Sequence, residues 1–218
     1  MVSSMYKLMK KAGFIVLVGL ALGSVDVNAA GNAPKPPKQE WSFNGMFGTF
    51  DRAAAQRGFQ VYQEVCAGCH SLRQIDFRHL IGIGYSEEQI KAFAAEAEVT
   101  DGPNDEGEMF DRPGTPADAL PKPFPNDQAA AASNNGKVPP DLSLMNKARI
   151  GGADYVHGIL IGYTEVPSGV EVPEGGNYNA YFPGHIIAMA APLSDEGVEY
   201  QDGTKATVAQ QAKDVVTF

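Results

Sequence analysis

The chain holds only two cysteines, Cys66 and Cys69, in the stretch VCAGCHS, and His70 follows the second cysteine directly. A structural disulfide in an oxidising compartment would be expected to join distant cysteines rather than to span two residues. Three chemistries compete for the pair: a redox dithiol, half of a zinc site, or a covalently attached haem.

The surrounding sequence favours haem attachment. A zinc site needs four ligands, and His79, His157 and His185 show no second ligand pair at finger-like spacing. A redox Cys-x-x-Cys motif normally lies near a strand–helix unit, which the sequence does not predict here. Cys-x-x-Cys-His is the pattern of c-type haem attachment, in which the two thiols add to the haem vinyl groups and the histidine becomes the proximal iron ligand. We therefore expect one covalent haem c.

The hydrophobic pattern predicts a mainly α-helical chain. A helix from Asp51 to Val65 leads into the motif, with one apolar stripe formed by Ala55, Phe59, Tyr62 and Cys66. Further helices are predicted from a capping box at Ser86 to about Glu98, from a candidate cap at Asp141 to Gly151-Gly152, from Ala153 to Ile161, and from near Thr204. Residues 99–133 and 163–185 are rich in Gly and Pro and are expected to be long irregular loops.

The first 29 residues have the layout of a secretory signal peptide. Three lysines precede the apolar run AGFIVLVGLAL, and Val27-Asn28-Ala29 suits cleavage before Ala30. An uncleaved anchor is the alternative, but the run is shorter than the roughly 20 apolar residues that span a bilayer. Residues 30–40 form a proline-rich leader, and residues 41–218 are expected to form one domain.

The formal net charge of −9 argues against nucleic acid as a partner and favours a basic protein. Cleavage would make the charge −11, because three lysines and Asp26 would leave. The acidic residues form two clusters, one made of Glu96, Glu98, Asp101, Asp105, Glu106, Glu108 and Asp111, and one made of Asp195, Glu196, Glu199 and Asp202. Each cluster is either a solvated face or a landing surface for a basic electron-transfer partner.

The sixth iron ligand decides the chemistry, since methionine suits an electron carrier and an open position permits ligand or peroxide chemistry. Met189 lies in FPGHIIAMAAPL, a Pro/Gly turn followed by a short apolar run far downstream of His70. Such a segment can fold over the opposite haem face. Core packing is the other interpretation of Met189, and His185 is a rival ligand.

Several longer stretches resemble the cytochrome c1 family, the haem-bearing subunits of ubiquinol–cytochrome c reductase, in its α-proteobacterial form. They include VYQEVCAGCHSL, DGPNDEGEMFDRPG, NNGKVPPDLSLMNKARIGGADYV and YFPGHIIAMAAPL, and the likeness runs from Trp41 to Phe218. The resemblance implies a cytochrome c-like helical domain around one covalent haem. It also implies that haem thioethers form at Cys66 and Cys69.

The resemblance further implies that His70 and Met189 are the two axial iron ligands. It places Asn134, Pro140, Arg149 and Tyr155 in the haem pocket, where Arg149 and Tyr155 would bond a propionate.

The resemblance implies an electron carrier without bond chemistry of its own. The carrier would sit with cytochrome b in a membrane complex at the periplasmic face, with a transmembrane anchor following Phe218. It would take electrons from the Rieske iron–sulfur protein and pass them to a soluble basic c-type cytochrome. A peroxidase-like haem enzyme and a free periplasmic carrier are the rival functions.

Overall fold

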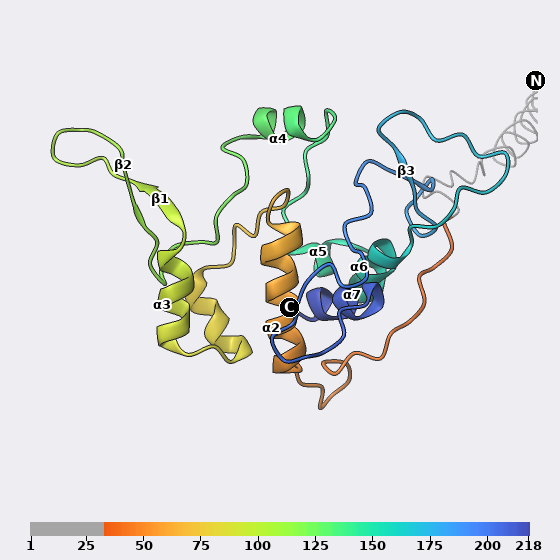
Figure 1. Ribbon diagram of the computed structural model, residues 1–218, viewed down its shortest axis with the longest axis horizontal. Helices are drawn as coiled ribbons and strands as arrows, with labels where there is room; N and C mark the ends of the chain where they lie inside the picture. Colours follow the sequence, from red (N-terminus) through yellow and green to blue (C-terminus); the bar gives the residue numbers. More distant parts are fainter. Residues whose placement is uncertain (1–32) are drawn as a thin grey trace, which may run out of the picture. The chain divides into compact units, whose positions relative to one another are not determined.

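The fold is described from a computed structural model, which covers residues 33–218. The predicted signal peptide, residues 1–29, and the start of the leader lie outside the described residues. The part described is mainly helical, as predicted (Figure 1). Its helices are α2 (Arg52–Val61), α3 (Glu87–Ala95), α4 (Asp127–Ser133), α5 (Met145–Ala148), α6 (Gly152–Ile161) and α7 (Val208–Thr217), with a π-helical turn η1 (Tyr62–Cys66) and a 3₁₀ helix η2 (Phe77–Ile83). The strands are β1 (Glu98–Asp101), β2 (Phe110–Pro113), β3 (Asn177–Tyr178) and β4 (Ile186–Ile187).

Helix α2 carries the cysteine motif at its carboxyl end. The Asp51 side chain caps the helix by accepting from the Ala54 backbone N–H at 3.1 Å. The predicted apolar stripe is buried at Ala55, Phe59 and Tyr62, because these positions recur on one helical face. The regular α-helix ends at Val61, four residues earlier than predicted, and the π-helical turn η1 continues it through Cys66.

Helix α2 packs directly on α7 (Figure 1). Gly58 makes the close approach possible, since a Cβ atom there would overlap the Asp214 carbonyl of α7. The Arg57 guanidinium adds a two-pronged ion pair with the fully buried Asp214 carboxylate, at 2.8 and 3.0 Å, and reaches Asp202 at 2.8 Å. Leaving either charge of such a buried pair alone is costly, so the network fixes how the motif-bearing helix sits on α7.

Two hydrophobic clusters lie on either side of α2. One joins Phe59 and Tyr62 to η2, α3 and the residues after the motif, and its buried members are Phe59, Tyr62, Leu72, Phe77, Leu80, Ile90, Ala94 and Leu120. The other joins Val61 to the C-terminal segment, and its buried members are Val61, Leu193, Val198, Tyr200, Ala206 and Ala212. Burying a large apolar side chain contributes about 1.5–3 kcal/mol to folding, and both clusters therefore stabilise the position of α2.

The prediction of an irregular loop over 99–133 is wrong in two places. Strands β1 and β2 form an antiparallel hairpin there, and α4 occupies the end of the segment. Arg112 closes the hairpin by bonding Asp101 at 2.5 Å and both oxygens of Asp118 at 2.8 and 2.9 Å. These ion pairs, rather than hydrophobic alternation, stabilise the strands, and for that reason the sequence pattern did not reveal them.

Other element boundaries also differ from prediction. Helix α3 has the predicted capping box at Ser86 but ends at Ala95, where the chain turns into β1. Helix α7 begins at Val208 rather than near Thr204, because the Thr207 hydroxyl caps it by accepting from the Gln210 N–H at 3.2 Å. The expected loop 163–185 contains β3, which pairs with β4.

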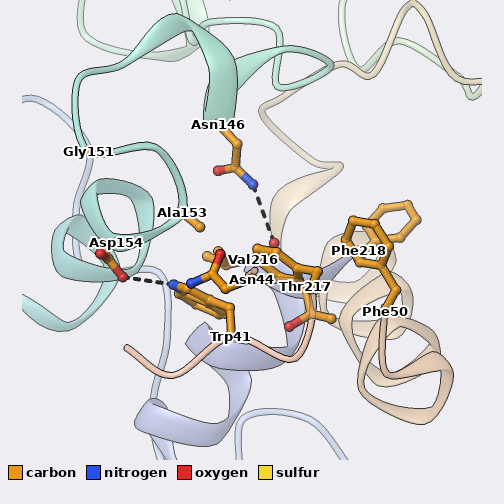
Figure 2. Close-up of a pocket in the computed structure, with 11 residues that line it drawn as sticks. Trp41, Asn44, Phe50, Asn146, Gly151, Ala153, Asp154, Val216, Thr217 and Phe218 are labelled. Carbon is orange, nitrogen blue, oxygen red and sulfur yellow. Dashed lines mark hydrogen bonds between the residues drawn. The ribbon is translucent and has the colours of Figure 1, made fainter. Parts of the chain in front are cut away.

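The end of the leader is tied to α6. The Asp154 carboxylate accepts from the Gln39 backbone N–H at 3.0 Å and from the Trp41 indole at 2.7 Å, as Figure 2 shows for Trp41. Beside this contact lies a pocket of about 390 Å³ between the Trp41 region, α6 and the end of α7. None of the candidate haem residues lines that pocket. Within residues 33–218, no helix has the length and apolarity that crossing a bilayer requires.

Candidate functional site

The cysteine motif forms a single tight turn at the end of η1. The Cys69 and His70 backbone N–H groups both donate to the Cys66 carbonyl, at 3.1 and 2.9 Å. Cys66 is half-buried and Cys69 is exposed, and both are free thiols. Burial, with a smaller effect of Cys69, raises the pKa of the Cys66 thiol to about 11. A redox-active dithiol needs a lowered pKa at its attacking thiol, and burial shifts the pKa of Cys66 in the opposite direction.

The His70 side chain is oriented by the backbone of Pro140. Its Nδ1 lies 2.7 Å from the Pro140 carbonyl oxygen. A carbonyl can only accept, so Nδ1 carries the hydrogen, and in the corresponding neutral tautomer the lone pair is at Nε2. Metal-bound histidines almost always use their second nitrogen in this way, which fixes both ring orientation and tautomer. Pro140 is thus brought to the motif, and His70 is prepared to bind a metal through Nε2.

The segment that carries Pro140 is fastened to the motif by Asp141. Its Oδ2 accepts from the Ser71 hydroxyl at 2.7 Å and the Arg73 backbone N–H at 2.9 Å, while Oδ1 accepts from the Ser143 N–H at 3.0 Å. The prediction that Asp141 caps a helix is wrong, since α5 begins only at Met145. Its carboxylate is instead used for contacts with residues about seventy positions earlier, which no local pattern reveals.

We expect Asp141→Asn to destabilise the folded protein by about 1–3 kcal/mol, because donors reach both carboxylate oxygens and one of these would be replaced by an NH2 group, which cannot accept. Burial raises the pKa of Asp141, but hydrogen bonds from Arg73, Ser143 and Ser71 outweigh it and hold that pKa well below its usual range. The stabilisation is therefore present above the ordinary Asp pKa of about 3.9 and is lost as the pH falls through the folded-state pKa. Urea unfolding between pH 7 and pH 2 measures both effects.

The matched control is Asp105→Asn, at an exposed turn of the β1–β2 hairpin. At each pH, the urea midpoint of this variant should equal that of the unsubstituted protein. An Asp141→Asn protein as stable as the unsubstituted protein at pH 7 would show that the carboxylate does not hold Pro140 in place.

Met189 lies in the segment that follows β4 and is half-buried. The Tyr163 hydroxyl donates to its carbonyl oxygen at 3.0 Å. Leu193, four residues on, packs in the same cluster as Val65, which directly precedes Cys66. The chain after Met189 is therefore brought against the helix that carries the motif.

His185, the rival ligand, occupies a left-handed backbone conformation with φ 63°. Its ring stacks on Tyr178 with centroids 5.6 Å apart, and its Nδ1 is buried without a hydrogen-bond partner among the described residues. The ring is therefore packed against Tyr178, and His185 and Met189 stay competing candidates for the sixth position.

The three remaining candidates for the haem pocket make no hydrogen bond to the cysteine motif in the part of the chain that the structure describes. Asn134 ends α4 and donates its amide to the Ala130 carbonyl of the same helix at 2.7 Å. Arg149 is exposed, and its guanidinium contacts only the neighbouring Ala148 carbonyl, at 3.2 Å, among the described residues. Tyr155 is half-buried in α6. Arg149 is thus available to a carboxylate such as a propionate.

Large apolar side chains lie open on both sides of Pro140. Val138 is 47% exposed, Leu144 is 51% exposed and Ile150 is fully exposed. Exposed apolar side chains on this segment, the thiols of Cys66 and Cys69 and the oriented His70 ring are residue types that suit a largely apolar porphyrin. Sequence reasoning did not identify Val138, Leu144, Ile150 or Tyr163.

Comparison with known proteins supports the family resemblance that the motifs indicate. The model of the Cytochrome C1 family matches residues 41–218. A Bradyrhizobium diazoefficiens protein named cytochrome b/c1 is 53% identical over 222 residues, which cover 91% of this chain and 32% of that protein. The mitochondrial cytochrome c1 heme protein of Schizosaccharomyces pombe is 55% identical over 181 residues, covering 83% of this chain and 59% of that protein.

A third relative is the mitochondrial cytochrome c1-2 heme protein of Solanum tuberosum. It is 50% identical over 208 residues, which cover 95% of this chain and 79% of that protein. The chain spans less than two thirds of the length of the Bradyrhizobium and Schizosaccharomyces relatives. The family model nevertheless matches the whole segment from Trp41 to Phe218, and the resemblance predicted from the motifs is confirmed. The chain belongs to the cytochrome c1 family.

Proposed function

We propose that the chain is the one-electron carrier subunit of a quinol–cytochrome c oxidoreductase. The observation that carries the proposal is the 2.7 Å contact between His70 Nδ1 and the Pro140 carbonyl, which leaves Nε2 as an oriented metal ligand directly after two free thiols. Proteins that carry the name cytochrome c1 are described as heme proteins. A haem c supplies a one-electron redox centre when bound.

The residues of this chain have distinct roles in that proposal. Cys66 and Cys69 would form the thioether bonds, and His70 Nε2 and the Met189 thioether would bind the iron of a haem c. Pro140 orients His70, Arg149 and Tyr155 bond a propionate, and Asn134 lines the pocket. The protein itself would make and break no substrate bonds, because these residues would hold and orient the haem, which supplies the one-electron chemistry.

The partners follow from the same assignment. The Bradyrhizobium relative is named for both cytochrome b and cytochrome c1, and we propose that this chain sits beside cytochrome b in a membrane complex. It accepts electrons from the Rieske iron–sulfur protein at the periplasmic face. A signal peptide at residues 1–29 and a membrane anchor beyond Phe218 complete this proposal.

The electron leaves to a soluble basic c-type cytochrome that docks on the β1–β2 hairpin. Asp101 is bound to Arg112, and Asp111 accepts from the Thr100 hydroxyl at 2.7 Å, so these two acids are used within the hairpin. Asp105, Glu106 and Glu108 lie exposed at its turn, next to Met109 and Phe110, which are 60% and 43% exposed. Exposed acidic side chains next to exposed apolar ones suit a weak, steered encounter.

We expect the double variant Glu106→Lys with Glu108→Lys to slow electron transfer to a basic cytochrome c by about tenfold or more at low salt. Charge steering raises association rates by about 10–1,000-fold and is screened by salt. Stopped-flow oxidation of the reduced holoprotein at increasing ionic strength measures the effect. The two rates should converge in high salt.

The matched control is Glu171→Lys with Glu174→Lys, which makes the same change of net charge in another exposed loop. It should slow the reaction far less. Equal slowing by both double variants would mean that net charge, and not the hairpin, steers the partner.

The function itself is tested in the assembled membrane complex. Adding quinol should reduce the haem of this chain, and a soluble c-type cytochrome should then reoxidise it. A resting haem that binds carbon monoxide or cyanide readily and turns over peroxide would instead establish the rival function of a haem enzyme.

A further inference from the structure

The backbone carbonyl of Met189 accepts a hydrogen bond from the phenol of Tyr163, close to the end of α6. Tyr163 lies two residues after α6 and donates its hydroxyl hydrogen to the Met189 carbonyl oxygen at 3.0 Å. Its own backbone forms an antiparallel bridge with Asn179. One residue therefore contacts both the start and the end of the segment 179–189.

The side chain of Asn179 connects the segment 179–189 to α6 by a hydrogen bond. Its side chain is fully buried, donates to the Ile159 carbonyl at 2.8 Å and accepts from the Tyr181 N–H at 3.1 Å. Its backbone N–H donates to the His185 carbonyl at 2.8 Å. Gly162 leaves room for this arrangement, since a Cβ atom there would lie 2.5 Å from the Asn179 side-chain oxygen. The base of the segment is thus rigidly placed.

The strand pairing ends just before Met189. Strands β3 and β4 pair Asn177 with Ile187, and the Asn177 amide reaches the Ala188 carbonyl only at 3.4 Å. Beyond that point, the Tyr163 hydroxyl is the side-chain donor that the described residues offer to the Met189 backbone. Fixing the backbone matters because a methionine side chain has three rotatable bonds and reaches many positions.

We propose that Tyr163 is a positioning residue that holds the Met189 thioether at the haem iron and keeps competing ligands out. This inference rests on the proposed function, because it needs Met189 as the iron ligand. Losing the bond favours the state in which the thioether has left the iron.

The test is Tyr163→Phe in the haem-loaded protein, with imidazole as the probe of the sixth position. A hydrogen bond of ordinary net strength corresponds to about a fivefold change in an equilibrium constant. We therefore expect imidazole to bind the oxidised haem about fivefold more tightly, since a binding-competent state that is more populated raises the apparent affinity. Titration of the visible spectrum measures the affinity, and the far-red methionine–iron band should weaken.

The matched control is Tyr85→Phe, which removes a phenol hydroxyl from the cluster around Phe59. It should leave imidazole binding unchanged. A Tyr163→Phe protein that melts at a lower temperature but binds imidazole as the unsubstituted protein does would overturn the proposal, because the phenol would then be merely structural. A methionine–iron band that survives Met189→Ala would instead remove Met189 from the iron, which is a failure of the proposed function.

Discussion

The double variant Cys66→Ser with Cys69→Ser is expected to contain no covalent haem. Serine hydroxyls do not add to vinyl groups under the conditions in which thiols do, so neither thioether can form. His70 alone would then have to retain the porphyrin through its single iron bond. Denaturing the purified protein should release all of its haem, and intact-mass spectrometry should show the bare polypeptide where the unsubstituted protein carries the mass of one haem.

The control for this result is Ala67→Ser, which adds a hydroxyl to the same turn and leaves both thiols in place. It should keep the covalent haem. The single variants should each retain one thioether, with Cys69 the more accessible of the two thiols because Cys66 is half-buried. Covalent haem in the double variant would refute the attachment site.

The fold around the motif was predictable because the relevant signals are local. The stripe at Ala55, Phe59 and Tyr62 repeats at helical spacing, and the structure buries all three side chains. The capping box at Ser86 needs only residues within one turn, and it is present as predicted. The helices whose determining residues are close together in the sequence were therefore predicted correctly.

The errors have a common physical origin in contacts between distant residues. The four-residue strands β1 and β2 carry no apolar alternation that would reveal them, and Arg112 reaches Asp101 and Asp118 across the hairpin. The local sequence predicts that Asp141 caps a helix, but its carboxylate instead accepts hydrogen bonds from Ser71 and Arg73, which are distant in the sequence. Tertiary contacts overrode the local preference at both positions.

The candidate site divides in the same way. The pentapeptide alone predicts Cys66, Cys69 and His70 as haem-binding residues, whereas spacing leaves Met189 and His185 as competing ligands. Neither the contact of Tyr163 with Met189 nor that of Pro140 with His70 could be read from a single sequence, since the partners are 26 and 70 residues apart. The order of elements along the chain does not tell which loops meet.

Met189→Ala is expected to abolish the methionine–iron band and to lower the reduction potential of the haem by on the order of 100 mV. A thioether stabilises the reduced iron relative to a nitrogen ligand or water, and axial ligand identity tunes haem potentials over about 0.8 V. The variant should also bind carbon monoxide in the reduced state, because the sixth position would be open. Potentiometric titration and difference spectra measure these changes.

Two further variants decide between the possible ligands. Met145→Ala removes a methionine from α5 and should change neither the band nor the potential, while His185→Ala removes the ring that stacks on Tyr178. If His185→Ala opened the sixth position and Met189→Ala did not, the ligand would be a nitrogen and the potential would be low. The electron could then no longer pass downhill to a cytochrome of raised potential, so the identity of this one ligand decides whether the chain can act as the relay proposed for it.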